Sequence, residues 1–149
     1  MSPCIFVIES TGTQPIRVEY TPKGETPLTL EQLKTIHYMA NLAYKMFVDP
    51  FIQAAKTKYN ICDLNMMSFL IFNIFYIKYD HSLEPPKEMY DIWNKIKNER
   101  YYKHFFKHFL GIYIHSLHQC KPYYYKQNVK KFFAKYKELT GNDFVYKVR

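Results

Sequence analysis

The sequence predicts an α+β fold that is mostly helical, with about six helices around a central apolar helix over residues 64–79 and a small antiparallel sheet. Three observations predict it: a segment apolar on every helical side, amphipathic helical patterns on both flanks of that segment, and alternating patterns near both chain ends. Because the 149 residues contain no internal repeat or flexible linker, we expect a single domain, residues 1–149.

The central segment is LNMMSFLIFNIFYIKY, whose apolar run is interrupted before Lys78 only by Asn65, Ser68 and Asn73. A helix that is apolar all round is expected to be enclosed by its neighbours, and each buried polar side chain then needs a hydrogen-bond partner. The run from residue 66 to 77 is shorter than the ~20 residues needed to cross a bilayer. We therefore predict a core helix and no membrane partner.

The predicted sheet begins with a hairpin of residues 4–8 (CIFVI) and residues 16–20 (IRVEY). The second segment alternates apolar and polar side chains, which is typical of a half-buried strand, whereas the first is apolar on both sides and is expected to be central. A lone hairpin is marginal in water. The C-terminal tail, with Phe144, Tyr146 and Val148 on one side, is therefore a candidate third strand.

The first helix is expected over residues 30–48, after a capping box formed by Thr29 and Gln32. His37 lies on its apolar arc and is predicted to be a core histidine rather than a functional one. Asp49 and Pro50 are typical of a helix start, so a second helix is expected to about Tyr59. Asp63 is then expected to cap the central helix, and the loop of residues 80–86 to end it.

Residues 87–119 have a helical pattern throughout, but the apolar face changes direction along it. One side of such a helix would carry Met89, Ile92, Trp93 and Ile96, whereas the aromatic residues after Tyr101 would lie on a different side. A straight helix cannot turn its buried face so far, so we predict a break at residues 98–101 and a second helix to Gln119. A last helix is expected to end at Leu139, with Gly141 after it.

Composition indicates a compartment and a source. The chain has 18 lysines but only 3 arginines and is rich in Phe, Tyr, Met, Ile and Asn, which is typical of an AT-rich coding genome such as that of a virus, a phage or a reduced parasite. The three cysteines are odd in number and widely spaced, so no disulfide framework or cysteine-rich zinc site is expected. The N-terminus lacks the basic start of a signal peptide. We expect an intracellular protein of a reducing compartment, the cytoplasm or nucleus.

The basic charge is concentrated near the C-terminus. Residues 1–94 hold 8 basic and 10 acidic side chains (net −2), whereas residues 95–139 hold 11 basic and 2 acidic ones (net +9). Lysines interleaved with aromatic side chains suit a phosphate backbone with bases stacked nearby. The candidate nucleic-acid-binding residues are Lys121, Tyr123, Tyr124, Tyr125, Lys126, Lys130, Lys131, Lys135 and Lys137. A solvated helix face in a lysine-rich protein would have the same pattern.

Four histidines would share one arc of the predicted helix over residues 102–119: His104, His108, His115 and His118. Their spacings could seat pairs of imidazoles on a metal. However, no acidic residue or cysteine shares the arc, and the opposite side is apolar, so the histidines are expected simply to occupy the polar side. We predict no metal site and no cofactor.

The sequence has no GxSxG motif, Gly-rich phosphate loop, HExxH motif or paired carboxylates, so an enzyme is not expected. The predicted function is a small non-enzymatic binding protein, plausibly viral, that contacts nucleic acid non-specifically through the basic, tyrosine-bearing C-terminal surface. Few arginines are available for base-specific contacts. The alternative is a protein interaction or virion assembly module that binds a host factor or itself, because 19% aromatic residues exceeds the obvious need of one core.

Overall fold

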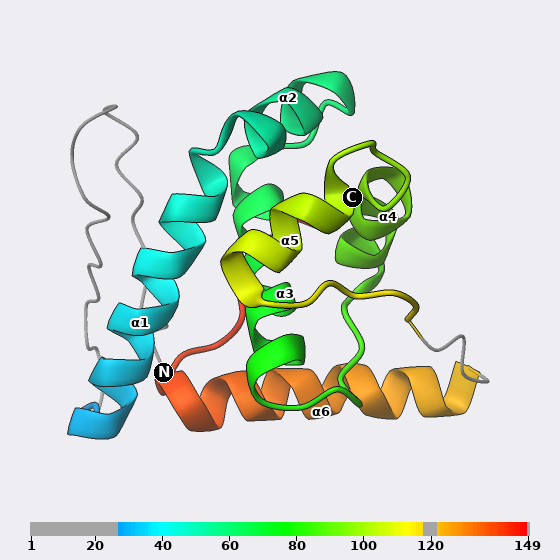
Figure 1. Cartoon of the computed structure of the whole chain (residues 1–149). Helices are drawn as coiled ribbons and strands as arrows, with labels where there is room; N and C mark the ends of the chain where they lie inside the picture. Colours follow the sequence, from blue (N-terminus) through cyan, green and yellow to red (C-terminus); the bar gives the residue numbers. More distant parts are fainter. Residues whose placement is uncertain (1–26, 118–121, 149) are drawn as a thin grey trace.

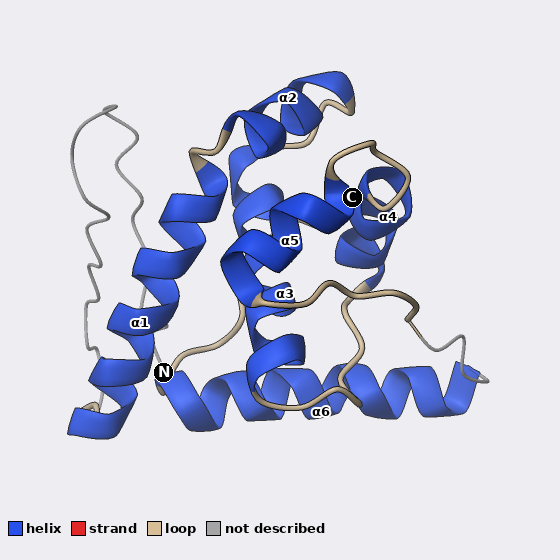
Figure 2. Ribbon diagram, viewed as in Figure 1, coloured by secondary structure: helices blue, strands red, loops and turns tan. Residues whose placement is uncertain are grey.

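The computed structural model of the chain describes residues 27–117 and 122–148, and in these ranges it contains six helices and no strand (Figure 2). The predicted small sheet is therefore wrong for the C-terminal tail, which is described and contains no strand. The predicted N-terminal hairpin, residues 4–20, lies outside the described residues. The expectation of a mostly helical fold is confirmed for the described part of the chain.

Six helices follow one another along the chain: α1 (Leu30–Phe47), α2 (Pro50–Lys58), α3 (Asp63–Lys78), α4 (Lys87–Ile96), α5 (Tyr102–Leu110) and α6 (Pro122–Thr140). Helix α3 runs through the middle of the molecule, and α6 lies along one edge (Figure 1). Helix α1 packs against α2, α3 and α6, and α3 packs against α4.

Helix α3 is the enclosed helix that the sequence predicts. Every residue from Asn65 to Phe75 is buried, which covers three turns on all sides. Two polar side chains in this stretch donate hydrogen bonds: Asn73 Nδ2 to the Phe69 carbonyl oxygen at 2.8 Å, and Ser68 Oγ to the Val145 carbonyl oxygen at 2.7 Å. The buried Asn73 Oδ1 has no hydrogen-bond partner among the described residues.

The C-terminal tail, residues 141–148, packs along α3 because two polar side chains of that helix bind the tail backbone. Asn65 Oδ1 accepts from the Lys147 backbone N–H at 2.7 Å, and Asn65 Nδ2 donates to the Lys147 carbonyl oxygen at 3.0 Å. These contacts take the place of the strand partner that we expected. Phe144 and Tyr146 face the core as predicted, but Val148 does not, being 68% exposed.

The helix starts follow their sequence signals with one exception. The Thr29–Gln32 capping box is present on α1, and the Asp49 carboxylate accepts from the Phe51 N–H at 2.9 Å at the start of α2. The expected Asp63 cap of α3 is wrong, because Cys62 is the N-cap residue and provides no side-chain bond. The Asp63 carboxylate lies within the first turn, where it bonds Lys56 Nζ at 2.7 Å.

The predicted break between α4 and α5 is confirmed, since α4 ends at Ile96 and α5 begins at Tyr102. The predicted extension of α5 to Gln119 is wrong. Gly111, at φ +84°, adopts the left-handed conformation that commonly ends helices, and residues 112–117 continue as a loop. The Tyr102 hydroxyl secures this loop by accepting from Trp93 Nε1 at 3.0 Å and donating to the Ile114 carbonyl oxygen at 2.8 Å.

The end of α6 meets the start of α1 at Gly141. This residue has φ +73°, and a Cβ atom there would come within 2.3 Å of Leu28 Cδ2. The left-handed backbone therefore favours glycine, and a Cβ atom would also displace the end of the Leu28 side chain.

His37, on the exposed side of α1, is not the core histidine that we predicted, because the apolar arc there is narrower than the sequence indicates.

Candidate binding surfaces

The lysine-rich face of α6 is the first candidate surface. Helix α6 is 19 residues long, about 28 Å at 1.5 Å per residue, and five lysines project from it. Lys126, Lys130 and Lys131 are exposed, whereas Lys135 and Lys137 are half-buried. Lys121 lies outside the described residues.

Two of these lysines already have acidic partners. Lys131 Nζ lies 3.2 Å from Asp80 Oδ2, and Lys137 Nζ lies 3.0 Å from Asp143 Oδ1. Hydrogen bonds from Ser82, together with Lys131, lower the pKa of Asp80 to about 2. Lys126, Lys130 and Lys135 form no ion pair with any described residue.

The tyrosines at the start of α6 differ in position. Tyr124 is 57% exposed, whereas the hydroxyl of half-buried Tyr125 donates to the Pro85 carbonyl oxygen at 2.7 Å. Burial raises the pKa of Tyr125 to about 12. Tyr125 therefore packs against the protein instead of offering its ring to a base. The side chain of Tyr123 is not described.

The histidines that the sequence places on one arc do not share one helix. His104 and His108 are exposed neighbours on α5, but His115 lies in the loop after Gly111, and His118 lies outside the described residues. Within the described ranges, no three His, Cys, Asp or Glu side chains are placed so that they could hold a metal ion.

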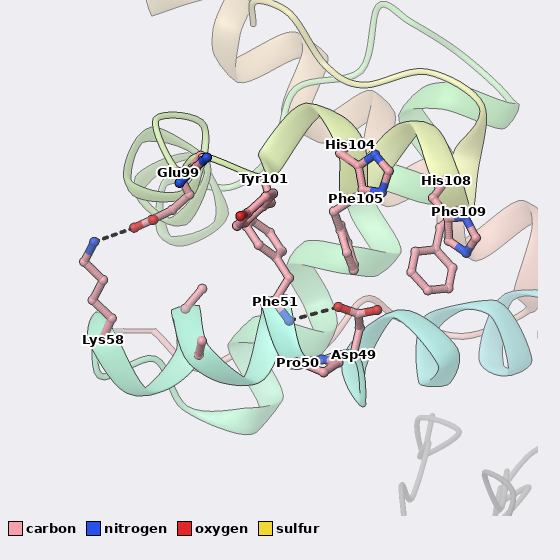
Figure 3. Close-up of a pocket in the computed structure, with 13 residues that line it drawn as sticks. Asp49, Pro50, Phe51, Lys58, Glu99, Tyr101, His104, Phe105, His108 and Phe109 are labelled. Carbon is pink, nitrogen blue, oxygen red and sulfur yellow. Dashed lines mark hydrogen bonds and ion pairs between the residues drawn. The ribbon is translucent and has the colours of Figure 1, made fainter.

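The second candidate surface is a groove of about 650 Å³ between α2 and α5, here called the α2–α5 groove. Figure 3 shows α2 and α5 on its two sides, with Phe105 between them. The side chains that line it include Asp49, Phe51, Ala54, Lys58, Glu99, Arg100, Tyr101, His104, Phe105, His108 and Phe109. A concave apolar site with a few polar groups is the usual form of a binding pocket.

The floor of the α2–α5 groove is a row of aromatic rings. The rings of Phe51 and Phe105 stack at a centroid distance of 5.0 Å, and Phe105 and Phe109 are also 5.0 Å apart. Phe105 is buried, Phe51 and Phe109 are half-buried, and Tyr101 is 57% exposed. Aromatic surface is therefore left open along the groove.

A polar cluster closes one end of the α2–α5 groove. Glu99 Oε1 accepts from Lys58 Nζ at 2.7 Å and from the Tyr59 hydroxyl, and so joins the end of α2 to the turn before α5. The hydrogen bond from Lys58 lowers the pKa of Glu99, and the bond to Glu99 raises that of Tyr59. In the sequence, only the surplus of aromatic residues indicates this groove.

A buried carboxyl group, that of Glu84, lies in the segment between α3 and α4. Glu84 is 2% exposed, and its Oε2 has no hydrogen-bond partner. Its backbone N–H donates to the Asn128 carbonyl oxygen of α6 at 3.4 Å. Burial raises the pKa of Glu84 to about 7.

Comparison with known protein-family models, with curated proteins and with solved structures finds no match for this chain. In the described part of the chain, no helix has both the length and the apolar character needed to span a bilayer. No relative indicates a function for the protein, so we infer one from the two surfaces.

Proposed function

We propose that the protein binds nucleic acid non-specifically, through the phosphate backbone, using the lysine-rich face of α6. The observation that carries the proposal is the display of five lysines and a single acidic residue, Glu138, along one helix at the edge of the molecule (Figure 1). Cations spread along the length of one helix suit a regular row of phosphates. Few arginines are available for reading base edges, so we expect affinity without sequence preference.

Two features of this face refine the proposal. Exposed ion pairs are weak, so phosphate can compete with Asp80 for Lys131 and with Asp143 for Lys137. Tyr125 is excluded from base contact by its bond to Pro85, which leaves Tyr124 as the described tyrosine with an exposed ring. Contact with the backbone therefore outweighs stacking in this proposal.

The test is a salt titration of binding to short single- and double-stranded DNA and RNA. The variant Lys126→Gln/Lys130→Gln/Lys135→Gln is expected to reduce the slope of log K against log salt on duplex DNA by up to about 3. A matched control is Lys45→Gln/Lys78→Gln/Lys87→Gln, which removes three exposed lysines from other helices. Absence of binding at low salt, or an equal loss in both variants, contradicts the proposal.

A further variant makes the protein more positive instead of less positive. Asp80→Asn removes the anion beside Lys131 and is expected to tighten binding and steepen the salt dependence. The control is Asp91→Asn on α4, which changes the net charge equally and touches no α6 lysine in the described ion pairs. Equal effects of the two variants would indicate a response to net charge alone.

A further inference from the structure

We propose that the exposed side of α5 and the loop after it form a second nucleic-acid contact, one that takes an unpaired strand. A phosphate is held between Lys103 and Lys107, and a base stacks on Tyr113. These three residues and His115 are here called the Tyr113 cluster. The inference rests on the proposed function for the class of ligand, nucleic acid, but it uses none of the residues of α6.

The requirement for a polyanion comes from the charge of this side of α5. Its exposed side chains include no acid and are Lys103, His104, Lys107 and His108. Residues 95–117 contain five basic side chains and one acidic one, a net charge of +4 (5 − 1). The one acid, Glu99, already bonds Lys58 and Tyr59. A partner that presents several negative charges therefore complements this surface.

Two of these cations lie beside one aromatic ring. Lys103 Nζ is 5.6 Å and Lys107 Nζ is 5.5 Å from the centroid of the Tyr113 ring, and neither lysine forms an ion pair with a described residue. Like charges one helical turn apart repel each other, so an anion shared between them is favoured. Contacts of exposed cations with a ring are weak, so a phosphate can draw both ammonium groups to itself.

The ring of Tyr113 is held in place before any strand arrives. It meets the ring of buried Tyr102 edge to face at a centroid distance of 6.0 Å, and the Tyr102 hydroxyl donates to the Ile114 carbonyl oxygen at 2.8 Å. On the loop, the ring of His115 lies 6.3 Å from that of Tyr113 between centroids. Tyr113 is only half-buried, so part of its side chain remains accessible.

A fixed ring among cations favours a single strand over a duplex. Proteins that bind unpaired strands place aromatic rings where bases can stack and cations where the backbone passes. In a duplex the faces of the bases are already stacked on one another, so a duplex offers the cluster only its phosphates. The Tyr113 cluster therefore gains more from an unpaired strand.

An acidic membrane surface suits α5 less well, although the same cations would attract it. The apolar side chains of α5 are in the core, where Phe105, Phe106 and Leu110 are buried. The helix therefore has no apolar face to insert among lipids. An acidic protein could bond the lysines, but its carboxylates would gain nothing from the ring of Tyr113.

The experiment compares two strands of about 12 units by fluorescence anisotropy: oligothymidylate and an abasic strand with the same number of phosphates. The wild type should bind oligothymidylate about fivefold or more tightly, because only this strand offers bases to the ring. Tyr113→Leu keeps an apolar side chain against Tyr102 and should lose the preference. Tyr113→Phe keeps the ring and should retain it.

The lysines are tested by a separate variant. Lys103→Gln/Lys107→Gln should lower the slope of log K against log salt on oligothymidylate by about 1.4, at ~0.7 for each phosphate contact with a single strand. The matched control, Lys45→Gln/Lys78→Gln, removes two exposed lysines from α1 and α3 and should leave the slope unchanged.

The two nucleic-acid surfaces can fail separately. The triple α6 lysine variant should weaken binding of duplex DNA but keep the preference for oligothymidylate over the abasic strand. Tyr113→Leu should lose that preference but bind duplex DNA like the wild type. Unchanged duplex binding by the α6 variant would contradict the proposed function and leave the Tyr113 cluster standing.

Any of four outcomes would overturn the inference. The first is no binding of oligothymidylate at low salt, or equal binding of both strands by the wild type. The second is a preference that survives Tyr113→Leu or is lost in Tyr113→Phe. The third is an equal change of salt slope in the double lysine variant and its control. The fourth is competition by polyglutamate or anionic phospholipid vesicles that equals that of oligothymidylate at matched charge, which would indicate an acidic protein or a membrane instead.

Discussion

The aromatic rings beneath the C-terminal tail and those along the α2–α5 groove differ in what covers them. Phe132 and Tyr136 of α6 are buried under the tail, where Phe144 lies 4.7 Å from Phe132 and 5.3 Å from Tyr136 between ring centroids. Phe51, Phe105 and Phe109 have similar ring spacings, but only Phe105 is buried, and Phe51 and Phe109 are half-buried.

The cluster under the tail shows how a short segment of this chain covers aromatic rings. The tail supplies two rings, Phe144 and Tyr146, while Asn65 and Ser68 bond its backbone. Apolar packing and backbone bonds therefore act together there. No described segment makes both kinds of contact over the rings of the α2–α5 groove.

The largest expected effect comes from removing the C-terminal tail, which covers Phe132 and Tyr136. Truncation after Asn142 exposes Phe132 and Tyr136 and leaves Asn65 and Ser68 without their tail partners. At ~25 cal/mol per Å², loss of the packing of Phe144 and Tyr146, together with these bonds, should cost several kcal/mol, comparable to the total stability of a small domain. Chemical denaturation measures it. An unchanged midpoint would show that the tail does not cover the cluster.

The next effect concerns the other attachment of α6, through Glu84. Burial raises the pKa of Glu84 from 4.5 to about 7, so the folded state holds its proton more tightly than the unfolded state. The stability associated with protonated Glu84 is therefore fully present below pH 4.5 and is lost as pH rises through about 7. Glu84→Gln keeps a neutral group at every pH and should stabilise the protein at pH 8 by about 2–3 kcal/mol.

The measurement for Glu84→Gln is the difference in unfolding free energy from the wild type at pH 5 and pH 8. The difference should grow between these values, since only the wild-type carboxyl titrates. Glu138→Gln, at an exposed α6 position, is the control and should give a flat difference. A flat difference for Glu84→Gln as well would mean that its carboxyl is not held neutral.

A smaller effect is expected when only the Asn65 bonds to the tail backbone are lost and the tail itself is kept. Asn65→Ala leaves the Lys147 N–H and carbonyl groups without their side-chain partner and should cost ~1–3 kcal/mol, less than truncation because the rings of the tail remain. Asn41→Ala is the exposed control. A loss equal to that of truncation would show that Asn65 alone holds the tail.

Helix positions were predictable because they depend on local signals. The Thr29 capping box, Asp49–Pro50 and the change of apolar face before Tyr102 lie within a few residues of what they determine. The tail was mispredicted because alternation in Phe144, Tyr146 and Val148 fits a strand equally well, and the Asn65 bonds that decide it lie 82 residues away. The extension past Leu110 failed because one glycine conformation outweighs a continuing pattern.

The candidate sites were less predictable than the fold. Charge could be counted from the sequence, so the lysines of α6 were found, but the partners Asp80 and Asp143 depend on the folded chain. The groove needs α2 and α5 to meet, and nothing near Phe51 in the sequence indicates Phe105 as its partner. Surplus aromatic content indicated that an open surface existed but not where.

The smallest effect should come from weakening the hydrogen bonds that Glu99 accepts from Lys58 and Tyr59. Glu99→Gln keeps the side-chain shape but removes the charge that bonds Lys58 and Tyr59, and these groups are exposed enough for water to replace the lost bonds. We expect a fall in melting temperature smaller than that of Asn65→Ala, with faster hydrogen exchange confined to the last turn of α2 and residues 97–101. Glu31→Gln is the matched control and should leave that exchange unchanged, since the Glu31 carboxylate lies 3.7 Å from Lys34 Nζ on α1.

The same pair predicts a pH dependence. Because the wild-type contact with Lys58 lowers the pKa of Glu99, the stability that Glu99 contributes is present above the ordinary glutamate range and is lost as pH falls. The difference between Glu99→Gln and wild type should therefore shrink in acid, and a difference that grows in acid would show that this cluster does not hold the groove.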